Sequence, residues 1–334
     1  MSSPTNVRFP SRGIDIAGHL YTPPPSSNST PDRHHAAIII GHPGTGVKEQ
    51  TAGLYARVLS EAGFMTLAFD AAYQGESGGS PRGLEDPYQR AEDFKAAVTF
   101  LSTLSSSSSS INREDEEKKS VAAVVVDPQR IDVLGICASG GYVPFAAQTD
   151  KRMRAVATIS GACLGDVTRR GIEGSVLSSK VTPDMLDAML KRSGQDRITA
   201  ALTGDVPVNA MLPENAADLP SDIPDRSSTK EGIDYYKTPR GSHPRSTNTE
   251  VSWGVDLRAN YDSYAFNYMI SPRPLLMIVG GDADTAYQSR RAIEKAREPK
   301  ELFVIEGKSH VDLYDDTSET LPKLVDFMEK ALCH

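Results

Sequence analysis

The chain has 334 residues, of which 39% are hydrophobic and 24% are charged, and its net charge is -8. This length suits one large α/β domain with an insertion, or two small domains. The acidic balance argues against a nucleic-acid or anionic-membrane surface, because both need clustered positive charge.

Cysteine usage and the N-terminus indicate the compartment. Cys137, Cys163 and Cys333 are few and odd in number, and they lack metal-ligand spacing, so neither a disulfide framework nor a zinc site is predicted. Residues 1–6 lack the apolar run of a signal peptide, and no stretch is long enough to span a bilayer. We therefore expect a cytoplasmic monomer or homodimer that uses no metal or cofactor.

Strands and helices alternate through the first half of the chain. Residues 7–9 and 14–21 flank a Pro-Ser-Arg-Gly turn and predict an antiparallel hairpin at the edge of a sheet. Three further apolar runs, at 36–40, 64–69 and 131–134, are typical of strands covered on both faces. Helical spacing follows the first two of them. This βαβα order predicts a mostly parallel sheet with helices on both faces.

Two segments interrupt this order. Residues 105–119 combine a serine run with a block of charge, which predicts a disordered surface insertion. Residues 163–258 lose strand periodicity, with a helical part near 185–190, and are interpreted as a cap or lid. The sheet domain then comprises residues 1–162 and 259–334, and its last strands are predicted at 274–281 and 301–305.

A reactive residue follows the strand at 131–134, in the pattern Gly135-x-Cys137-x-Ser139-Gly-Gly. A nucleophile held in a tight turn between strand and helix needs small residues two positions before and after it. Cys137 fits that position. Two alternatives remain open: Ser139 as nucleophile in a shifted frame, and Cys137 as a small buried core residue.

A thiol nucleophile needs a base, and the base needs a residue that orients it. Asp284 and His310 each follow a late strand, in the chain order nucleophile, acid, histidine that α/β-hydrolases use. Asp282 competes with Asp284 for the acid's role.

The oxyanion that forms during acyl transfer needs hydrogen-bond donors. The backbone N–H of Ala138 is one candidate, and Gly44 or Thr45 in the loop His-Pro-Gly-Thr-Gly supplies the second. The same loop could bind phosphate, but it lacks the Lys-Ser/Thr ending of a P-loop and the spacing of a dinucleotide fingerprint.

Several motifs spread over residues 7–330 resemble one branch of the α/β-hydrolase superfamily. That branch is related to dienelactone hydrolase and holds YcjY-like proteins and fungal polyketide transferases and thiohydrolases. The motifs are HPGTGVKEQ, FDAAYQGESGG, LEDPYQR, GICASGGY, DYYKTPRGSHPRS, SPRPLLMI and KSHVDLYD. The resemblance implies the α/β-hydrolase fold, with Cys137 as nucleophile, Asp284 as acid and His310 as base.

The resemblance also implies a class of reaction. We expect a cysteine-dependent hydrolase or acyltransferase that takes an acyl group onto Cys137 and releases it to water or an alcohol, as acid, ester or lactone. A polyketide thioester delivered by an acyl carrier protein in secondary metabolism is the expected substrate. The alternatives are an ester or lactone hydrolase like dienelactone hydrolase, and a non-catalytic scaffold.

One motif, at residues 234–243, has no evident catalytic role. It contains Tyr236 and Arg240, which either pack the cap against the sheet domain or line the acyl pocket as substrate-binding residues.

Overall fold

The computed structural model describes residues 3–24, 33, 35–104, 124–173 and 181–333. The insertion predicted to be disordered, at 105–119, lies outside the described residues.

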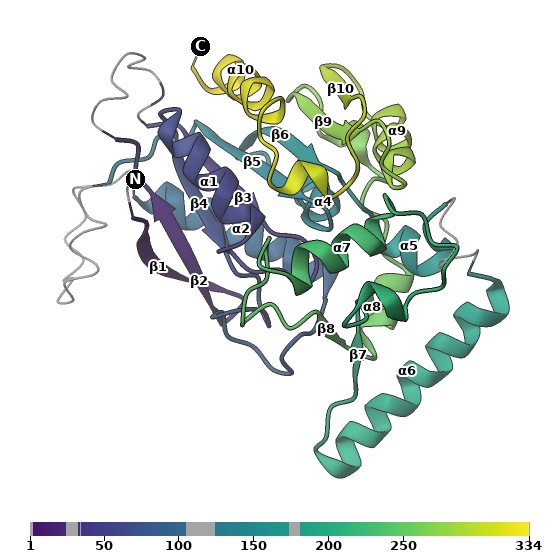
Figure 1. Cartoon of the computed structure of the whole chain (residues 1–334). Coiled ribbons are helices and arrows are strands. Elements are labelled where there is room, and N and C mark those ends of the chain that lie inside the picture. The colour runs from purple at the N-terminus through teal and green to yellow at the C-terminus, as the bar shows by residue number, and fades with distance from the viewer. Residues whose placement is uncertain (1–2, 25–32, 34, 105–123, 174–180, 334) are drawn as a thin grey trace.

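An eight-stranded sheet forms the centre of the molecule, with strand order β1-β2-β4-β3-β5-β6-β9-β10 (Figure 1). β1 and β2 form the predicted antiparallel hairpin at one edge, and β2 pairs antiparallel with β4. The pairs from β4 to β10 are parallel. The strands are β1 (Thr5–Ser11), β2 (Ile14–Tyr21), β3 (Ala37–Gly41), β4 (Met65–Phe69), β5 (Ile131–Ile136), β6 (Met153–Ile159), β9 (Leu275–Gly280) and β10 (Lys300–Ile305).

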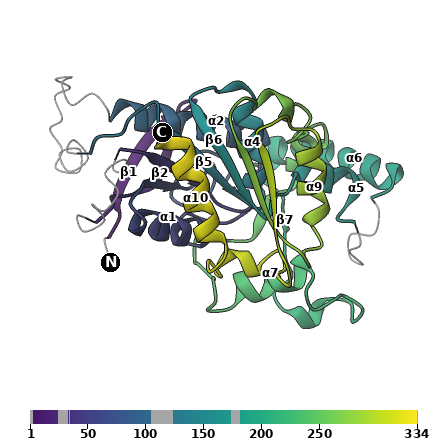
Figure 2. The same ribbon diagram turned by 90° about the horizontal axis from the view of Figure 1, so that it is seen from above.

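Helices cover both faces of this sheet, as the apolar strands require (Figure 2). α1 (Thr51–Glu61) and α10 (Thr320–Leu332) pack on one face, and α2 (Pro87–Thr103), α4 (Ser139–Thr149) and α9 (Ala286–Glu294) pack on the other. Two short 3-10 turns, η4 (Asn267–Met269) and η5 (Asp312–Tyr314), lie in the connections. The predicted fold class is confirmed: this is the arrangement of an α/β-hydrolase.

The segment predicted as a cap is mostly helical, but it is not free of strands. β7 and β8 form a small antiparallel pair. Each strand has three residues, which is too short to leave a periodic signal in the sequence. The segment's elements are α5 (Leu164–Arg170), α6 (Pro183–Thr203), β7 (Val208–Ala210), η3 (Ala216–Asp218), α7 (Ser228–Lys237), β8 (Thr249–Val251) and α8 (Gly254–Ala259).

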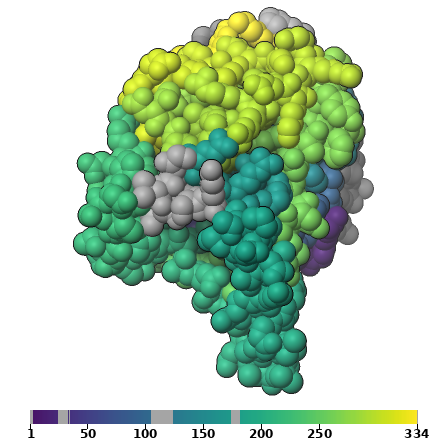
Figure 3. Space-filling model, turned by 90° about the vertical axis from the view of Figure 1, so that its right-hand side faces the viewer, coloured from purple at the N-terminus to yellow at the C-terminus, as the bar shows by residue number. Residues whose placement is uncertain are grey.

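α6 projects from the body of the molecule as an arm (Figures 1 and 3). It is much longer than the helical part predicted near residues 185–190. Its ends are set locally, because the Thr182 side chain accepts a hydrogen bond from the N–H of Met185 and Gly204 adopts a left-handed conformation after the last turn. Within the described residues, no helix is long and apolar enough to cross a membrane.

One carboxyl group is buried inside the central sheet. Asp132, in β5, is fully buried and neither of its side-chain oxygens has a hydrogen-bond partner. The register between β5 and β6 shifts at this point. Burial raises the pKa of Asp132 well above its ordinary value, because the charged form loses its hydration.

We predict that Asp132→Asn makes stability less dependent on pH. A carboxyl group whose pKa is higher in the folded state than its unfolded value of about 3.9 raises the free energy of unfolding. This contribution is present in full only below about pH 3.9. The contribution is then lost as the pH rises through the folded pKa, by about 1.4 kcal/mol per pH unit. Thermal unfolding at pH 4.5, 6 and 7.5 should therefore show an advantage of the variant that grows with pH. Asp187→Asn, on exposed α6, is the control, and an equal advantage at all three pH values would contradict the prediction.

Candidate active site

The turn at Cys137 joins β5 to α4. Cys137 adopts a φ of 54°, a left-handed conformation that costs a non-glycine residue about 1–3 kcal/mol. The turn is also closely packed: a Cβ on Gly135 would lie 2.1 Å from the carbonyl oxygen of Ser139, and one on Gly140 would lie 2.5 Å from the Cα of Gly161. These contacts explain the small residues on either side of Cys137.

Ser139, the alternative nucleophile, has a structural partner. Its side chain is fully buried, and its hydroxyl donates a 2.6 Å hydrogen bond to the carbonyl of His42. This bond ties the first turn of α4 to the loop that follows β3. The geometry therefore favours Cys137 over Ser139.

The surroundings of the Cys137 thiol favour its ionised form. Burial alone would raise the pKa of the thiol. The charge of His310, together with hydrogen bonds from His310, Tyr314 and the backbone N–H of Ala138, outweighs burial and lowers the pKa of Cys137 below its ordinary value. A larger thiolate fraction makes the sulfur a better nucleophile. This environment separates Cys137 from an inert core cysteine.

His310 is almost fully buried between β10 and α10. Its Nδ1 lies 2.5 Å from the hydroxyl of Thr285, and its Nε2 lies 3.2 Å from that of Tyr314. Burial alone would lower the pKa of His310, but the nearby Cys137 thiolate, and after it the charge of Asp284, raise it. The imidazole can therefore accept the proton that the Cys137 thiol releases.

Asp284 is placed beside this centre in a way that the sequence did not predict. One carboxylate oxygen accepts hydrogen bonds from both the N–H and the hydroxyl of Ser228, each at 2.9 Å, at the start of α7. The other oxygen is buried without a partner, and Thr285 instead occupies Nδ1 of His310. Asp284 therefore acts on the imidazole through its charge.

Asp282, the competing acid, points elsewhere. Its side chain is half exposed and its Oδ2 lies 3.5 Å from Arg226. The charge of Asp284, in contrast, helps to raise the pKa of His310. The arrangement favours Asp284.

The predicted oxyanion donors lie together. Gly44, Thr45 and Ala138 line the same pocket as Cys137, and a Cβ on Gly44 would lie 3.7 Å from that of Ala138. Thr45 adopts a φ of 54°, and its carbonyl accepts a 2.9 Å hydrogen bond from Ser246 in the cap. Residues of the cap thus hold one side of the predicted oxyanion hole.

A buried polar network holds the loop that carries Gly44 and Thr45. This network was not predicted from the sequence. His42 is buried, and burial lowers its pKa well below the ordinary value, so the ring is neutral. Its Nδ1 donates to the carbonyl of Pro43 at 2.7 Å, and its Nε2 accepts from the N–H of Ala71 at 3.1 Å. Arg90 lies 3.2 Å from the same Nε2 and pairs with Glu85 at 2.8 and 3.0 Å. The motif LEDPYQR, which contains Glu85 and Arg90, was the sequence signal from which this network could have been predicted.

The pocket above Cys137 is mostly apolar and has a volume of about 220 Å³. Tyr236, one of the two predicted substrate-binding residues, lines it. None of the residues that line it within the described chain is Asp, Glu, Lys or Arg. The lining residues are Pro43, Gly44, Thr45, Cys137, Ala138, Ala162, Leu164, Val167, Ile172, Met211, Leu212, Ser228, Thr229, Gly232, Tyr236, Thr285, His310, Val311 and Tyr314.

Arg240, the other predicted substrate-binding residue, lies outside this pocket. Its guanidinium makes two 2.7 Å bonds to the carboxylate of Asp315 and a 3.0 Å bond to Asp234. It also lies over the ring of Tyr235, with 5.6 Å to the centroid. This geometry supports the alternative role in packing the cap against the sheet domain.

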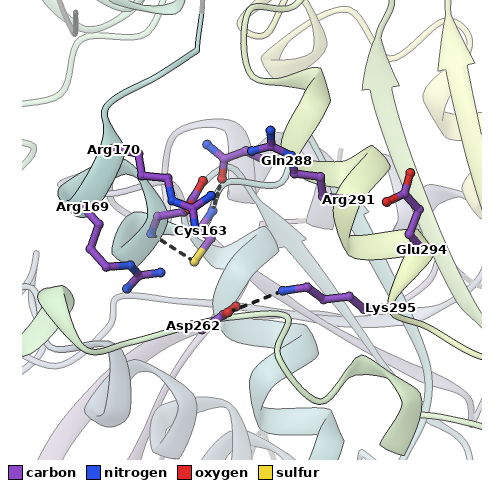
Figure 4. Close-up of a pocket in the computed structure, with 9 residues that line it drawn as sticks. Cys163, Arg169, Arg170, Asp262, Gln288, Arg291, Glu294 and Lys295 are labelled. Carbon is purple, nitrogen blue, oxygen red and sulfur yellow. Dashed lines mark hydrogen bonds and ion pairs between the residues drawn. The ribbon is translucent and has the colours of Figure 1, made fainter. Parts of the chain in front are cut away.

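A second pocket, of about 290 Å³, lies beside Cys163, the residue that precedes α5 (Figure 4). The Cys163 sulfur accepts hydrogen bonds from the N–H groups of Asp166 and Ser263, at 3.4 and 3.3 Å. Lys295 pairs with Asp262 in the pocket wall at 3.5 Å. Cys163 therefore has a structural place in the fold.

One cluster of the described residues has the composition of a metal site. Ligand atoms of His19, Glu49 and Glu76 lie within 4.8 Å of one another. The ammonium group of the buried Lys48 already contacts both glutamates, at 2.8 and 2.6 Å, and Asp70 at 2.8 Å. The two glutamates are therefore already paired with cations of the protein, Lys48 and Arg245. The absence of a metal and a cofactor stays a prediction.

The fold and this site define an α/β-hydrolase. No protein-family model matches the chain. The chain is 32% identical over 332 residues to the uncharacterised protein YcjY of Escherichia coli K12, covering 98% of the chain and 97% of YcjY. It therefore belongs to the family of YcjY.

Other relatives agree with this placement. The uncharacterised protein PA2218 of Pseudomonas aeruginosa is 39% identical over 317 residues, 92% of this chain and 75% of that protein. The PA2218 crystal structure has a TM-score of 0.82 at 36% identity and covers 98% of this chain and 93% of its own. A thiohydrolase of Eupenicillium brefeldianum is 25% identical over 312 residues, 92% of this chain and 87% of that protein. The α/β-hydrolase GrgF of Penicillium sp. sh18 shares the fold, with a TM-score of 0.75 at 20% identity over 100% of both chains.

We predict that His310→Ala raises the pKa of the Cys137 thiol. The variant removes the charge and the hydrogen bond that lower this pKa, while burial, which raises it, remains. The midpoint of Cys137 alkylation by iodoacetamide, followed by peptide mass spectrometry from pH 5 to 10, should move to higher pH. Alkylation of Cys333 in the same digest is the control. An unchanged midpoint would show that His310 does not activate the thiol.

We predict that Arg90→Met strongly lowers the free energy of unfolding. The double variant Arg90→Met with Glu85→Gln should lower it less. Removing Arg90 leaves a buried carboxylate without its partner, at a cost of about 3–5 kcal/mol. Replacing Glu85 as well removes that unpaired charge. Urea unfolding measures the free energy of unfolding of both variants. An equal decrease in the two would contradict this account.

Proposed function

We propose that this protein is a cysteine-dependent acyl hydrolase or acyltransferase that acts on thioesters. The observation that carries the proposal is the placement of Cys137, on a strained turn in the wall of a pocket that Ala138, His310 and Tyr314 also line. A thiolate with a base at one side and an oxyanion donor at the other is suited to acyl transfer.

Each step of the reaction uses one of these groups. The Cys137 thiolate attacks the carbonyl carbon of the thioester, and the N–H of Ala138, with Gly44 or Thr45, stabilises the oxyanion. The carbon–sulfur bond of the substrate breaks, and the leaving thiolate takes a proton from the His310 imidazolium. Water or an alcohol, deprotonated by His310, then attacks the acyl-cysteine and releases the thiolate of Cys137.

The choice of substrate follows from the nucleophile. Exchange of one thioester for another is nearly isoenergetic, so loading is readily reversible and the acyl group stays activated. The small pocket, which has no Asp, Glu, Lys or Arg among its described lining residues, suits a neutral acyl group. A relative named a thiohydrolase and another named a polyketide transferase support a polyketide thioester as the substrate. We propose an acyl carrier protein as its physiological donor.

Incubation with a hexanoyl N-acetylcysteamine thioester, followed by mass spectrometry of the intact protein and of the products, tests the proposal. We expect a hexanoyl adduct on Cys137 and its release as acid, or as ester when an alcohol is added. Cys137→Ala should lose both the adduct and product formation. Cys163→Ala, whose thiol is held by backbone N–H groups, should keep both.

Two outcomes would contradict the proposal. An adduct that persists in Cys137→Ala would place the nucleophile elsewhere. Turnover of simple esters or lactones with no reaction of the thioester would favour a hydrolase of the dienelactone type.

A further inference from the structure

The hydroxyl of Thr285 is turned away from the helix that follows it. Thr285 directly precedes α9, at a position where a threonine hydroxyl ordinarily accepts a hydrogen bond from an N–H of the first helical turn. Thr285 makes no such bond. Its hydroxyl lies instead 2.5 Å from Nδ1 of His310, and its side chain is buried. The contact with His310 therefore replaces a bond that would stabilise the helix.

The carboxylate of Asp284, the residue before Thr285, is held from another direction. Its Oδ2 accepts two hydrogen bonds of 2.9 Å from Ser228, one from the backbone N–H and one from the hydroxyl. Its Oδ1 is buried and has no hydrogen-bond partner among the described residues. The Nδ1 side of the His310 ring is thus occupied by the hydroxyl of Thr285 and not by this carboxylate.

The rest of His310 is also held in place. Its backbone carbonyl accepts a 2.9 Å hydrogen bond from the hydroxyl of Ser160, and its Nε2 lies 3.2 Å from the hydroxyl of Tyr314. Because the backbone is fixed, the contacts at the two ring nitrogens decide how the ring is turned. Thr285 supplies the contact at Nδ1.

Proton transfer from Cys137 gives the Nδ1 contact its importance. When Nε2 of His310 accepts the proton of the thiol, the imidazolium that forms carries an N–H at both nitrogens. The Nδ1–H then needs an acceptor, because a buried charged donor without a partner is costly. The hydroxyl oxygen of Thr285 has two lone pairs and lies within hydrogen-bond distance of Nδ1.

We propose that Thr285 is a positioning residue whose hydroxyl accepts the hydrogen bond from Nδ1–H of His310 and so keeps Nε2 available to Cys137. This is the place that a carboxylate takes in a Ser-His-Asp triad. Asp284 then acts on the ring through its charge alone. The inference rests on the pairing of Cys137 with His310 in the proposed function.

The first test removes the hydroxyl but keeps the shape of the side chain. In Thr285→Val the Nδ1–H loses its acceptor, so the imidazolium and the Cys137 thiolate that form together are both disfavoured. The pH midpoint of Cys137 alkylation by iodoacetamide should therefore move to higher pH. The kcat for the hexanoyl N-acetylcysteamine thioester should fall by about ten- to a hundredfold, the loss expected for one hydrogen bond from a charged donor, with little change in KM.

Three further variants isolate the hydroxyl. Thr285→Ser keeps it and should keep the wild-type midpoint and most of the kcat. Thr285→Ala lacks it and should behave as Thr285→Val. Serine and alanine both lack the methyl group, so their comparison holds even if valine disturbs the packing. Thr158→Val is the matched control, because it removes a fully buried hydroxyl without a hydrogen-bond partner, and it should leave both measurements unchanged.

The outcomes separate this inference from the proposed function. Alkylation needs no thioester, so a higher midpoint in Thr285→Ala than in Thr285→Ser supports the inference whatever the substrate is. A wild-type midpoint in Thr285→Ala, or the same shift in Thr285→Ala and Thr285→Ser, overturns the inference and leaves the proposed function standing. The lack of a hexanoyl adduct on wild-type Cys137 would count against the proposed function alone. Melting temperatures check that each variant is folded.

Discussion

The turn between β5 and α4 constrains the rest of the molecule. Cys137 keeps its left-handed backbone only because strand and helix are fixed on either side of it, and the glycines around it let them meet. The surrounding sheet supplies that rigidity, since β5 lies in its interior, between β3 and β6. The same turn presents the sulfur and the N–H of Ala138 to one pocket. The turn that strains the backbone is therefore the same turn that places the candidate nucleophile in the pocket.

Residues 163–258, the segment predicted as a cap, contribute directly to the candidate site. Ser228, at the start of α7, holds the carboxylate of Asp284, and Ser246 holds the carbonyl of Thr45. Tyr236 lines the pocket from the same helix as Ser228. Because Asp284, Thr45 and the pocket wall all contact residues 163–258, a shift of this segment would alter the pocket and the surroundings of His310 together.

Buried charge supports the loop that carries Gly44 and Thr45. Lys48 lies among three carboxylates, and Arg90 bridges Glu85 and the neutral ring of His42. Such pairs add little net stability over apolar packing, but losing one partner is costly. They fix the position of a loop that has little apolar surface of its own.

The sequence by itself determined the fold, and it predicted the candidate reactive residues, which stay a prediction. Continuous apolar strands alternating with helices specify a parallel sheet covered on both faces, and the glycine spacing around Cys137 predicts the turn, because both are local properties of the chain. The sequence could not determine which group binds Nδ1 of His310, where Arg240 points, or that β7 pairs with β8. Those contacts join residues 25 to 75 positions apart or three-residue strands without periodicity, so only the tertiary structure decided them.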